Sequence, residues 1–434
     1  MAEARRADPQ TDALEAAFAA ALERQRCALP PGAGFSCLLS AVSGGPDSMC
    51  LAALAHQYAS REGIGHRAVI VDHGIRADSA PEARRVEERL RSMGIEADVA
   101  RVTEPAPASG IQDWARSVRY ARLLEAARTH RAALLLGHHR DDQAETVAMR
   151  LRRGSGLAGL AGMRGAGLRE AVPLLRPLLG VDRDDILDFC KAKDIGFERD
   201  PSNRDRRFER VRVRQQLAAS DAVVSRDLSR LGGAAGRIDD ALIGALRCHG
   251  LLPPPRAGGY FRLPVSALAL PDETACRLLS CLVMQAVAPS HPPSRAALAR
   301  LVARLRAGIP SMLGGARFTG FDDGWLVTAE EGRHPLRIAV PAGNSLIFAG
   351  TWRVTSPVDA IVRRLGEAGS GAHAPWAESN GWCGLPPLAR RSVPVLQTLD
   401  GTLQYPHLFL HDRSCGRAGQ ARAEYLPYSL ASAG

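Results

Sequence analysis

The stretch FSCLLSAVSGGPDSMCLAALAHQY, residues 35–58, decides the fold. Its apolar run within residues 38–42 stops at Ser43-Gly44-Gly45-Pro46-Asp47-Ser48, and apolar residues at helical spacing follow directly. This pattern predicts a strand, a tight loop and a helix. Adjacent glycines let a loop turn sharply, and the helix directs unpaired N–H groups and a positive dipole end at it. The sequence therefore predicts an anion-binding loop.

The polar side chains of this loop refine the prediction. Ser43 and Ser48 supply hydroxyl donors, whereas the Asp47 carboxylate fits a phosphate pocket only if a cation lies between it and the phosphates. We interpret the loop as a site for pyrophosphate with Mg²⁺. The structural alternative is an ordinary glycine turn before a helix.

The string 43–48 resembles the SGGxDS loop of the PP-loop ATP pyrophosphatase superfamily, whose members activate a carbonyl oxygen by adenylation and release pyrophosphate. The resemblance implies ATP binding by the whole loop: Ser43, Gly44, Gly45, Pro46, Asp47 and Ser48. The chain has no Walker-type GxxxxGK[ST] string and the loop has no lysine, which argues against a phosphoryl-transfer NTPase.

Length and composition indicate a globular protein of two or three domains, with 434 residues and 46% hydrophobic content. No window approaches 18 apolar residues free of charge, and the first 26 residues lack the apolar segment of a secretory signal. We therefore expect a cytoplasmic protein without a membrane span. The sequence leaves the oligomeric state open, with a homodimer as one alternative.

Nine cysteines are scattered without a CxxC pair or zinc spacing, which indicates reduced thiols. The formal net charge is +10, and only Lys191 and Lys193 are lysines, so 56 minus 2, or 54, basic residues are arginine. Because such a skew also follows from coding bias, net charge alone is weak evidence for nucleic-acid binding. Where the arginines cluster is more informative.

Strands and helices alternate after the loop, which predicts an α/β fold with a doubly wound parallel sheet. The expected strands lie at 68–71, 97–102 and 132–136, and the expected helices lie at 80–93 and 111–130. Asp72-His73-Gly74-Ile75-Arg76 follows the first of these strands, at the edge of the sheet where doubly wound folds bind ligands.

Ionisable residues also follow the strand at 132–136. His138, Asp142 and Glu145 have the spacing i, i+4 and i+7, which would place them on one helix face. The acids suit Mg²⁺ or an ammonium group, whereas HHxxD lacks the usual zinc spacing. The structural alternative is a solvated helix start, where acids are favoured by the helix dipole.

The string GHHRDDQAET at 137–146, followed by Arg152-Arg153-Gly154, closely resembles the bacterial tRNA(Ile)-lysidine synthases. Further motifs agree in order: residues 72–76, 115–120, 175–179 and 200–203, so that the resemblance covers about residues 36–215. Asp72 stands where many relatives have histidine, and residues 210–214 depart from the relatives' RNxxR.

The resemblance implies a reaction in two steps. ATP adenylates the C2 oxygen of the wobble cytidine in tRNA(Ile) with the anticodon CAU, and free L-lysine then attacks C2 and expels AMP. Lysidine changes the codon and amino-acid specificity from Met to Ile. The positions of these residues in the family's motifs imply their roles. The loop, His73 and Gly74 would bind ATP, Asp47 and Asp141 would bind Mg²⁺, and Asp142 and Glu145 would bind lysine. The residues with an implied catalytic role are Asp47, Asp142, Glu145, Arg119 and Arg153.

Six arginines and two acids lie between Arg204 and Arg214, a net charge of 6 minus 2, or +4. Arginine forks suit phosphate oxygens, so we expect tRNA contacts from Arg206, Arg207, Arg210, Arg212 and Arg214. The alternative is a salt-bridged helix face. Because Arg212 and Arg214 alternate with valines, one of the two is expected to face the protein.

The expected domains are an N-terminal helix at 1–34, the catalytic domain at 35–217, a helical tRNA-contacting domain at 218–313, and a β-rich, partly irregular region at 314–434. Expected strands in the last region lie at 325–328, 336–340, 346–348 and 352–355.

Three competing functions remain open at this point. They are a tRNA thiolation enzyme, an amidotransferase-type synthetase with the same loop, and a non-catalytic nucleotide- or RNA-binding module.

Overall fold

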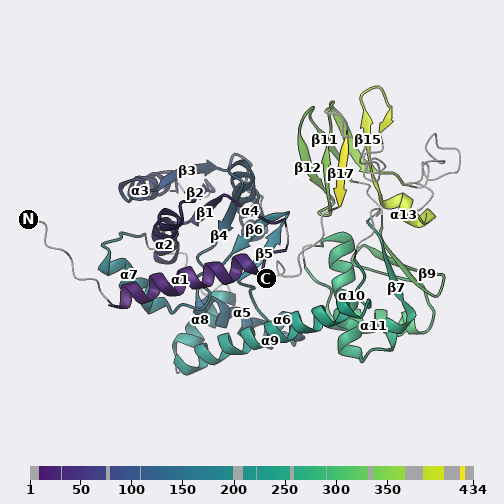
Figure 1. Ribbon diagram of the computed structural model, residues 1–434, viewed down its shortest axis with the longest axis horizontal. Coiled ribbons are helices and arrows are strands. Elements are labelled where there is room, and N and C mark those ends of the chain that lie inside the picture. The colour runs from purple at the N-terminus through teal and green to yellow at the C-terminus, as the bar shows by residue number, and fades with distance from the viewer. Residues whose placement is uncertain are drawn as a thin grey trace, which may run out of the picture. The chain divides into compact units, whose positions relative to one another are not determined.

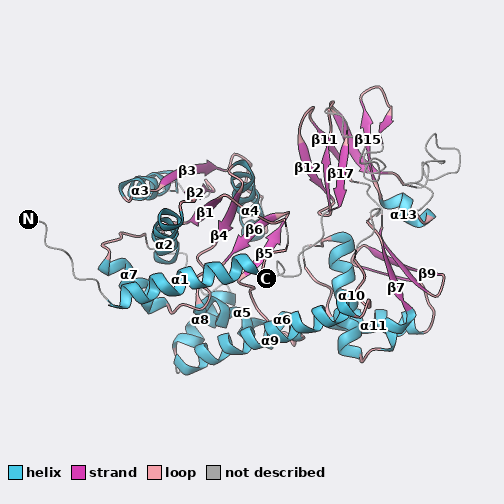
Figure 2. Ribbon diagram, viewed as in Figure 1, coloured by secondary structure: helices cyan, strands magenta, loops and turns pink. Residues whose placement is uncertain are grey.

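The computed structural model describes residues 9–30, 32–74, 79–107, 109–198, 209–220, 222–254, 259–289, 291–330, 336–366, 385–404 and 421–425 (Figures 1 and 2). The chain divides into two compact units, with the division between Arg237 and Ile238 inside a long helix. Each unit is described by itself. The expected domain boundaries at 34, 217 and 313 stay predictions.

The first unit is an α/β structure. Its elements are α1 (Pro9–Cys27), β1 (Cys37–Val42), α2 (Pro46–Glu62), β2 (Gly65–Asp72), α3 (Ser79–Ser92), β3 (Glu96–Arg101), α4 (Ile111–Thr129), β4 (Ala132–Leu135), α5 (Arg140–Arg152), α6 (Leu157–Leu160), β5 (Ala166–Arg169), β6 (Val172–Leu175), α7 (Arg183–Ala192), α8 (Glu209–Ala218) and the start of α9 (Ala222–Cys248).

The sheet of this unit has the strand order β3-β2-β1-β4-β6-β5. All neighbours are parallel except the edge strand β5, which forms a hairpin with β6. The doubly wound sheet is as predicted, and the hairpin is an addition. Its turn uses Glu170 and Ala171 with φ of 49° and 65°, values that usually select Asn or Gly, so the sequence carries no hairpin signal there.

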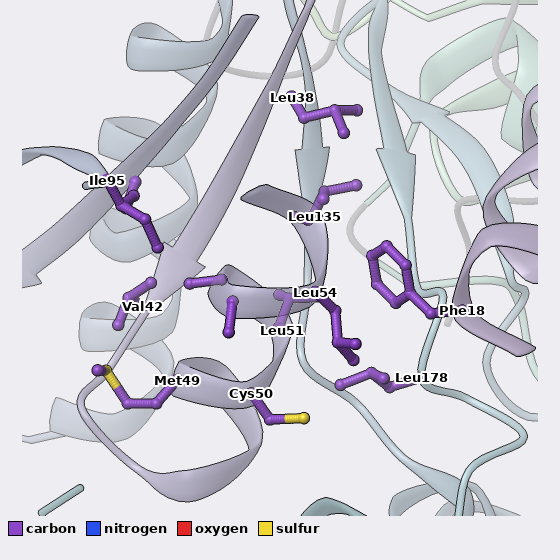
Figure 3. Close-up of a cluster of buried hydrophobic side chains, with 14 of the residues drawn as sticks. Phe18, Leu38, Val42, Met49, Cys50, Leu51, Leu54, Ile95, Leu135 and Leu178 are labelled. Carbon is purple, nitrogen blue, oxygen red and sulfur yellow. The ribbon is translucent and has the colours of Figure 1, made fainter. Parts of the chain in front are cut away.

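The apolar run of β1 is buried on both faces because helices cover both. Leu38 and Val42 belong to the core formed with α1, α2, α3 and α7, whereas Leu39 and Ala41 pack in a second core with α4. Figure 3 shows Leu38 and Val42 of β1 on the same side of the sheet as Leu51 of α2. This two-sided burial fixes where β1 ends and hence where the loop begins.

The second unit combines helices with antiparallel sheets, and it also contains the end of α9. Its elements are β7 (Phe261–Pro264), the 3₁₀ helix η2 (Val265–Ala269), α10 (Asp272–Val287), α11 (Arg295–Arg306), β8 (Ser311–Leu313), β9 (Ala316–Phe321), β10 (Gly324–Ala329), β11 (Arg337–Val340), β12 (Ser345–Phe348), β13 (Trp352–Thr355), β14 (Ala360–Arg364), α13 (Pro387–Ser392), β15 (Pro394–Thr398), β16 (Leu403–Gln404) and β17 (Arg422–Tyr425).

These strands form the sheets β7-β10-β9-β8, β11-β14-β15-β16 and β12-β13-β17. The four strands expected after residue 314 are found as β10 to β13. The region 218–313 is not purely helical, because Phe261–Pro264 pairs with β10 and is buried under α10 and α11. None of the helices in the described parts of the chain is both long and apolar enough to span a membrane.

Candidate active site

The loop between β1 and α2 has the shape that its glycines predict. Gly44 has φ of +85°, in the left-handed region, and a Cβ atom there would lie 2.6 Å from Val86 Cγ2. The Ser48 hydroxyl donates to the Gly45 carbonyl oxygen at 2.9 Å and accepts from the Ser43 N–H at 3.2 Å. Ser48 therefore holds the loop closed from within, and its predicted contact with phosphate stays a prediction.

Asp47 lies in the first turn of α2 with one carboxylate oxygen unsatisfied. Its Oδ1 is buried and has no hydrogen-bond partner among the described residues, while Oδ2 lies 3.9 Å from His139 Nε2. Burial raises the pKa of Asp47, and the nearby His139 opposes that shift. A cation bound at Oδ1 would satisfy the orphaned oxygen and keep the carboxylate ionised, so the residue fits Mg²⁺.

The end of β2 supplies a second wall of the site. The Gly74 N–H donates to Asp72 Oδ1 at 3.0 Å, and Gly74 adopts φ of +63°. The ring of His73 lines the cavity, and its pKa is lowered by burial and by the charge of Arg119. Arg119 of α4 lines the same cavity, and its catalytic role stays a prediction. Ile75 and Arg76 lie outside the described residues.

His139 is the N-cap of α5, and its ring lies between Asp47 and Asp142. The ring Nδ1 of His139 accepts from the backbone N–H of Asp141 at 3.3 Å. The backbone N–H of His139 donates to Asp142 Oδ2 at 3.1 Å, and the two bonds together form a capping box. The ring proton is therefore on Nε2, which lies 3.5 Å from Asp142 Oδ2. His139 is not among the residues to which the sequence motifs assign a role. The sequence does carry a signal for its capping role, because His139 stands three residues before an acid at the start of a helix.

Asp142 and Glu145 are buried side by side on α5 and are held by two arginines of α8. Arg210 donates from Nε to Glu145 Oε2 and from Nη2 to Asp142 Oδ1, both at 2.7 Å. Arg214 donates from Nε to Glu145 Oε1 at 2.5 Å and from Nη2 to Oε2 at 3.2 Å. We call these four residues the acid–arginine cluster. Two carboxylates face two guanidinium groups, so its formal charge is balanced.

The acid–arginine cluster sets the charge states of its members. Burial alone would raise the pKa of Asp142, but His139 and Arg210 outweigh it and the pKa is lowered. Burial would lower the pKa of Arg214, but the bond to Glu145 raises it instead. Asp142 and Arg214 are therefore held as ions, which is the arrangement that makes a buried pair tolerable.

The described part of the arginine run, residues 209–214, lies on α8, and two of its arginines point into the protein. Val211 and Val213 are buried on α8, Arg212 is exposed, and Arg214 is the one of the two alternating arginines that faces the protein. Arg210 points inward with it, although its place in the run predicts a phosphate contact. Arg206 and Arg207 lie outside the described residues. Binding of tRNA by the run stays a prediction.

Asp141, Arg153 and His138 are three further predicted site residues, and they lie in different places relative to the cavity. Asp141 lines the cavity and accepts from the Ser225 hydroxyl at 3.2 Å. Arg153 is not brought to the cavity: it caps the C-terminal end of α5, about 20 Å along the helix from its start, and pairs with Glu209. His138 precedes α5 instead of sharing its face.

His138 Nδ1 accepts from Arg176 Nε at 3.1 Å. Burial and the neighbouring Arg176 lower its pKa to about 3, so the ring is neutral.

A cavity of about 1720 Å³ joins these parts. Its walls include the loop at 43–47, Asp72 and His73, the first turns of α5, and Arg210 and Arg214 of α8. No group of three or more potential metal ligands gathers within the described ranges. At nucleotide sites Mg²⁺ needs only one or two carboxylates beside phosphate oxygens and water, which Asp47 supplies.

Comparisons with known proteins agree on one family. Residues 15–220 match the family described as the PP-loop domain. A tRNA(Ile)-lysidine synthase of Ruegeria pomeroyi is 34% identical over 347 residues, covering 78% of this chain and 82% of the relative. One of Novosphingobium aromaticivorans is 39% identical and covers 69% and 89%, and one of Hyphomonas neptunium is 36% identical and covers 72% and 84%.

Proposed function

The chain belongs to the tRNA(Ile)-lysidine synthase family, and we propose how the residues of its main cavity divide the work of lysidine formation. It is an ATP-using ligase of the PP-loop type. In the first step the C2 oxygen of the wobble cytidine attacks the α-phosphorus of ATP, and pyrophosphate leaves. In the second step the ε-amine of free L-lysine attacks C2, and AMP leaves with the former C2 oxygen.

The loop after β1 binds the pyrophosphate end of ATP. Its N–H groups and the start of α2 supply hydrogen bonds and positive potential, and charge-assisted bonds of this kind contribute about 1.5–3 kcal/mol each. Asp47, with its orphaned Oδ1, would hold Mg²⁺, which neutralises the leaving pyrophosphate when bound. Arg119 lines the same cavity, where it can balance charge on the adenylate.

Asp142 and Glu145 bind the ammonium group of lysine. Their carboxylates are already paired with Arg210 and Arg214, so an incoming ammonium must compete with two guanidinium groups. The phosphates of ATP in the same cavity offer these arginines an alternative partner. We therefore propose that bound ATP draws arginine side chains away from the acids and opens the lysine site.

Asp142 acts by holding charge, because its lowered pKa makes it a weak base. The lysine ammonium must lose a proton before attack. His139 Nδ1 is occupied by the Asp141 N–H and its Nε2 carries a proton, so His139 orients Asp142 and is not the base in this state.

The observation that carries this proposal is that one cavity holds both the pyrophosphate loop and a buried acid pair. A thiolation enzyme would usually add a CxxC pair, which the sequence lacks. The named relatives favour neither an amidotransferase-type synthetase nor a non-catalytic binding module. Because its proposed substrates are tRNA, ATP and free lysine, we also place the protein in the cytoplasm.

The test is incubation of the protein with a tRNA(Ile) transcript bearing CAU, ATP, Mg²⁺ and labelled lysine. We expect label to enter the transcript only when ATP and Mg²⁺ are present, and a transcript with the wobble cytidine replaced by uridine to remain unlabelled. Label in neither transcript, or in both equally, would contradict the proposal.

A further inference from the structure

A second cavity of about 410 Å³ adjoins the main one in the first unit. It is lined by Arg140, Gly180, Arg226, Ser229 and Arg230, and we call it the arginine recess. Arg140 and Arg226 line the main cavity as well, so the recess lies at its margin. No residue of the recess takes part in the pyrophosphate loop or the acid–arginine cluster.

The recess concentrates positive charge from two helices. Arg226 and Arg230 are four residues apart on α9 and share one face, and Arg140 begins α5 on the other side. Three guanidinium groups from these two helices therefore line one recess, which makes it a candidate site for an anion.

Acidic neighbours pair with two of the three arginines of the recess. Arg140 pairs with Asp182, and Asp141 and Asp185 also act on it. Arg230 Nη1 lies 3.5 Å from Asp227 Oδ1, in a pair exposed to solvent on both sides. For Arg226 no ion pair is found within the described ranges, so its guanidinium group remains available to a ligand.

The chemistry of the lining favours a phosphate group. Guanidinium forks bind phosphate oxygens in pairs, and the Ser229 hydroxyl adds a donor. Gly180 leaves its side of the recess open, because a Cβ atom there would have no neighbour within 4 Å. A nucleotide whose base enters the main cavity carries its backbone phosphates past the margin of that cavity. An RNA strand therefore brings a phosphate to the place where the recess lies.

We propose that the arginine recess binds a backbone phosphate of the tRNA anticodon loop, next to the nucleotide whose base enters the main cavity. This proposal rests on the proposed function, because it takes tRNA as the substrate. It places the tRNA contact on α9 and on the start of α5. Arg210 and Arg214, in contrast, are engaged inside the pocket.

The test compares Arg226→Ala/Arg230→Ala with Arg24→Ala/Arg26→Ala, a control that removes the same charge from α1, which lines neither cavity. Affinity for the CAU transcript is measured by filter binding over a salt series. Losing one phosphate contact should lower the log–log salt slope by about 0.7–0.9. It should also weaken binding about tenfold, the equivalent of one charge-assisted bond. The control should keep the wild-type slope.

A charge-preserving variant and a phosphate probe sharpen this test. Arg226→Lys/Arg230→Lys should keep the salt slope, because the count of cations is unchanged. Equal slopes for wild type and Arg226→Ala/Arg230→Ala, or equal losses in that variant and the α1 control, would overturn the recess as a tRNA contact. Inorganic phosphate is the second probe. If wild type and Arg226→Ala/Arg230→Ala have equal salt slopes, and inorganic phosphate raises the Tm of wild type but not of that variant, the recess binds free phosphate and the proposal is overturned.

The binding assay also separates this proposal from the proposed function. Wild-type protein that binds the transcript but incorporates no lysine would contradict the function and leave the recess result intact.

Discussion

The loop after β1 and the acid–arginine cluster line the same cavity but are built in different ways. The side-chain bonds that close the loop are local, because Ser48 bonds to Ser43 and Gly45, although the Gly44 carbonyl oxygen also accepts from the distant Glu198 N–H at 2.8 Å. The cluster is closed by bonds that span 65 to 69 positions, from α5 to α8. The shape of the loop thus rests mainly on contacts between residues close in sequence, whereas the cluster forms only when α8 packs on α5.

This difference implies different behaviour on binding. The loop has its N–H groups fixed by β1 and α2 before any ligand arrives, so it needs no rearrangement. The acid–arginine cluster is charge-balanced by its own arginines, so a ligand cation must displace or replace one of them. Substitutions in the loop should therefore act on all substrates together, and substitutions in the cluster should discriminate among them.

The largest effect is expected for Asp47→Asn. The change removes the carboxylate proposed to hold Mg²⁺ and should lower lysine incorporation about 10²–10³-fold, the scale of losing one preorganised electrostatic contact. Because burial raises the pKa of Asp47, its charge is unfavourable in the unliganded fold, and thermal stability should not fall. Asp188→Asn, at an exposed position of α7, is the matched control. Full activity with unchanged Mg²⁺ dependence would remove Asp47 from this role.

A smaller and more selective effect is expected for Glu145→Gln. The amide keeps the shape but not the charge, so kcat/KM for lysine should fall roughly 10- to 100-fold, the equivalent of one charge-assisted bond, while KM for ATP changes little. Steady-state kinetics with each substrate varied in turn gives the comparison. Glu125→Gln, at an exposed site on α4, is the control. Equal losses for both substrates would mean that Glu145 serves only to hold α8.

Substitution of the two loop glycines separates backbone shape from side-chain charge. Gly44→Ala forces a left-handed φ on alanine, which costs about 1–2 kcal/mol, and adds a clash with Val86. Gly45→Ala meets no atom closer than 3.9 Å and has φ of −72°, so its free energy of unfolding should stay near wild type. Chemical denaturation measures both. Similar losses for the two variants would show that loop shape does not depend on the left-handed residue.

The same contrast explains how much the sequence could predict. The loop, the alternating strands and helices, and the strand ends at Asp72 and His73 follow from residues close together in sequence, and they are found where predicted. The roles of Arg210 and Arg214 could not be read in this way. A run of arginines looks the same whether it faces phosphate or a buried Glu145, and only the packing of α8 on α5 decides.

Two further differences have local causes. Spacing alone predicts His138 on the helix face, but α5 begins only at Arg140 because His139 caps it. Motif position predicts a catalytic role for Arg153, yet the length of α5 carries it away from the cavity.

The smallest effect expected is in the pH dependence of stability. Burial lowers the pKa of His66 to about 3 from an ordinary value of 6.5, so below pH 6.5 the unfolded chain binds a proton that the folded protein excludes. Stability should therefore fall as the pH is lowered from 6.5 towards 3. His66→Gln should reduce that slope by up to about 1.4 kcal/mol per pH unit. Denaturation at pH 7, 6 and 5 is the measurement, and parallel pH profiles would contradict it.

The central claim is that one cavity couples pyrophosphate release to the attack of lysine. Its most direct measurement is a count, in one reaction, of lysine incorporated into the CAU transcript against AMP and pyrophosphate released. We predict one AMP and one pyrophosphate for each lysine incorporated, and no ADP. Pyrophosphate release that continues at the same rate without incorporation of lysine, or incorporation accompanied by ADP, would contradict it.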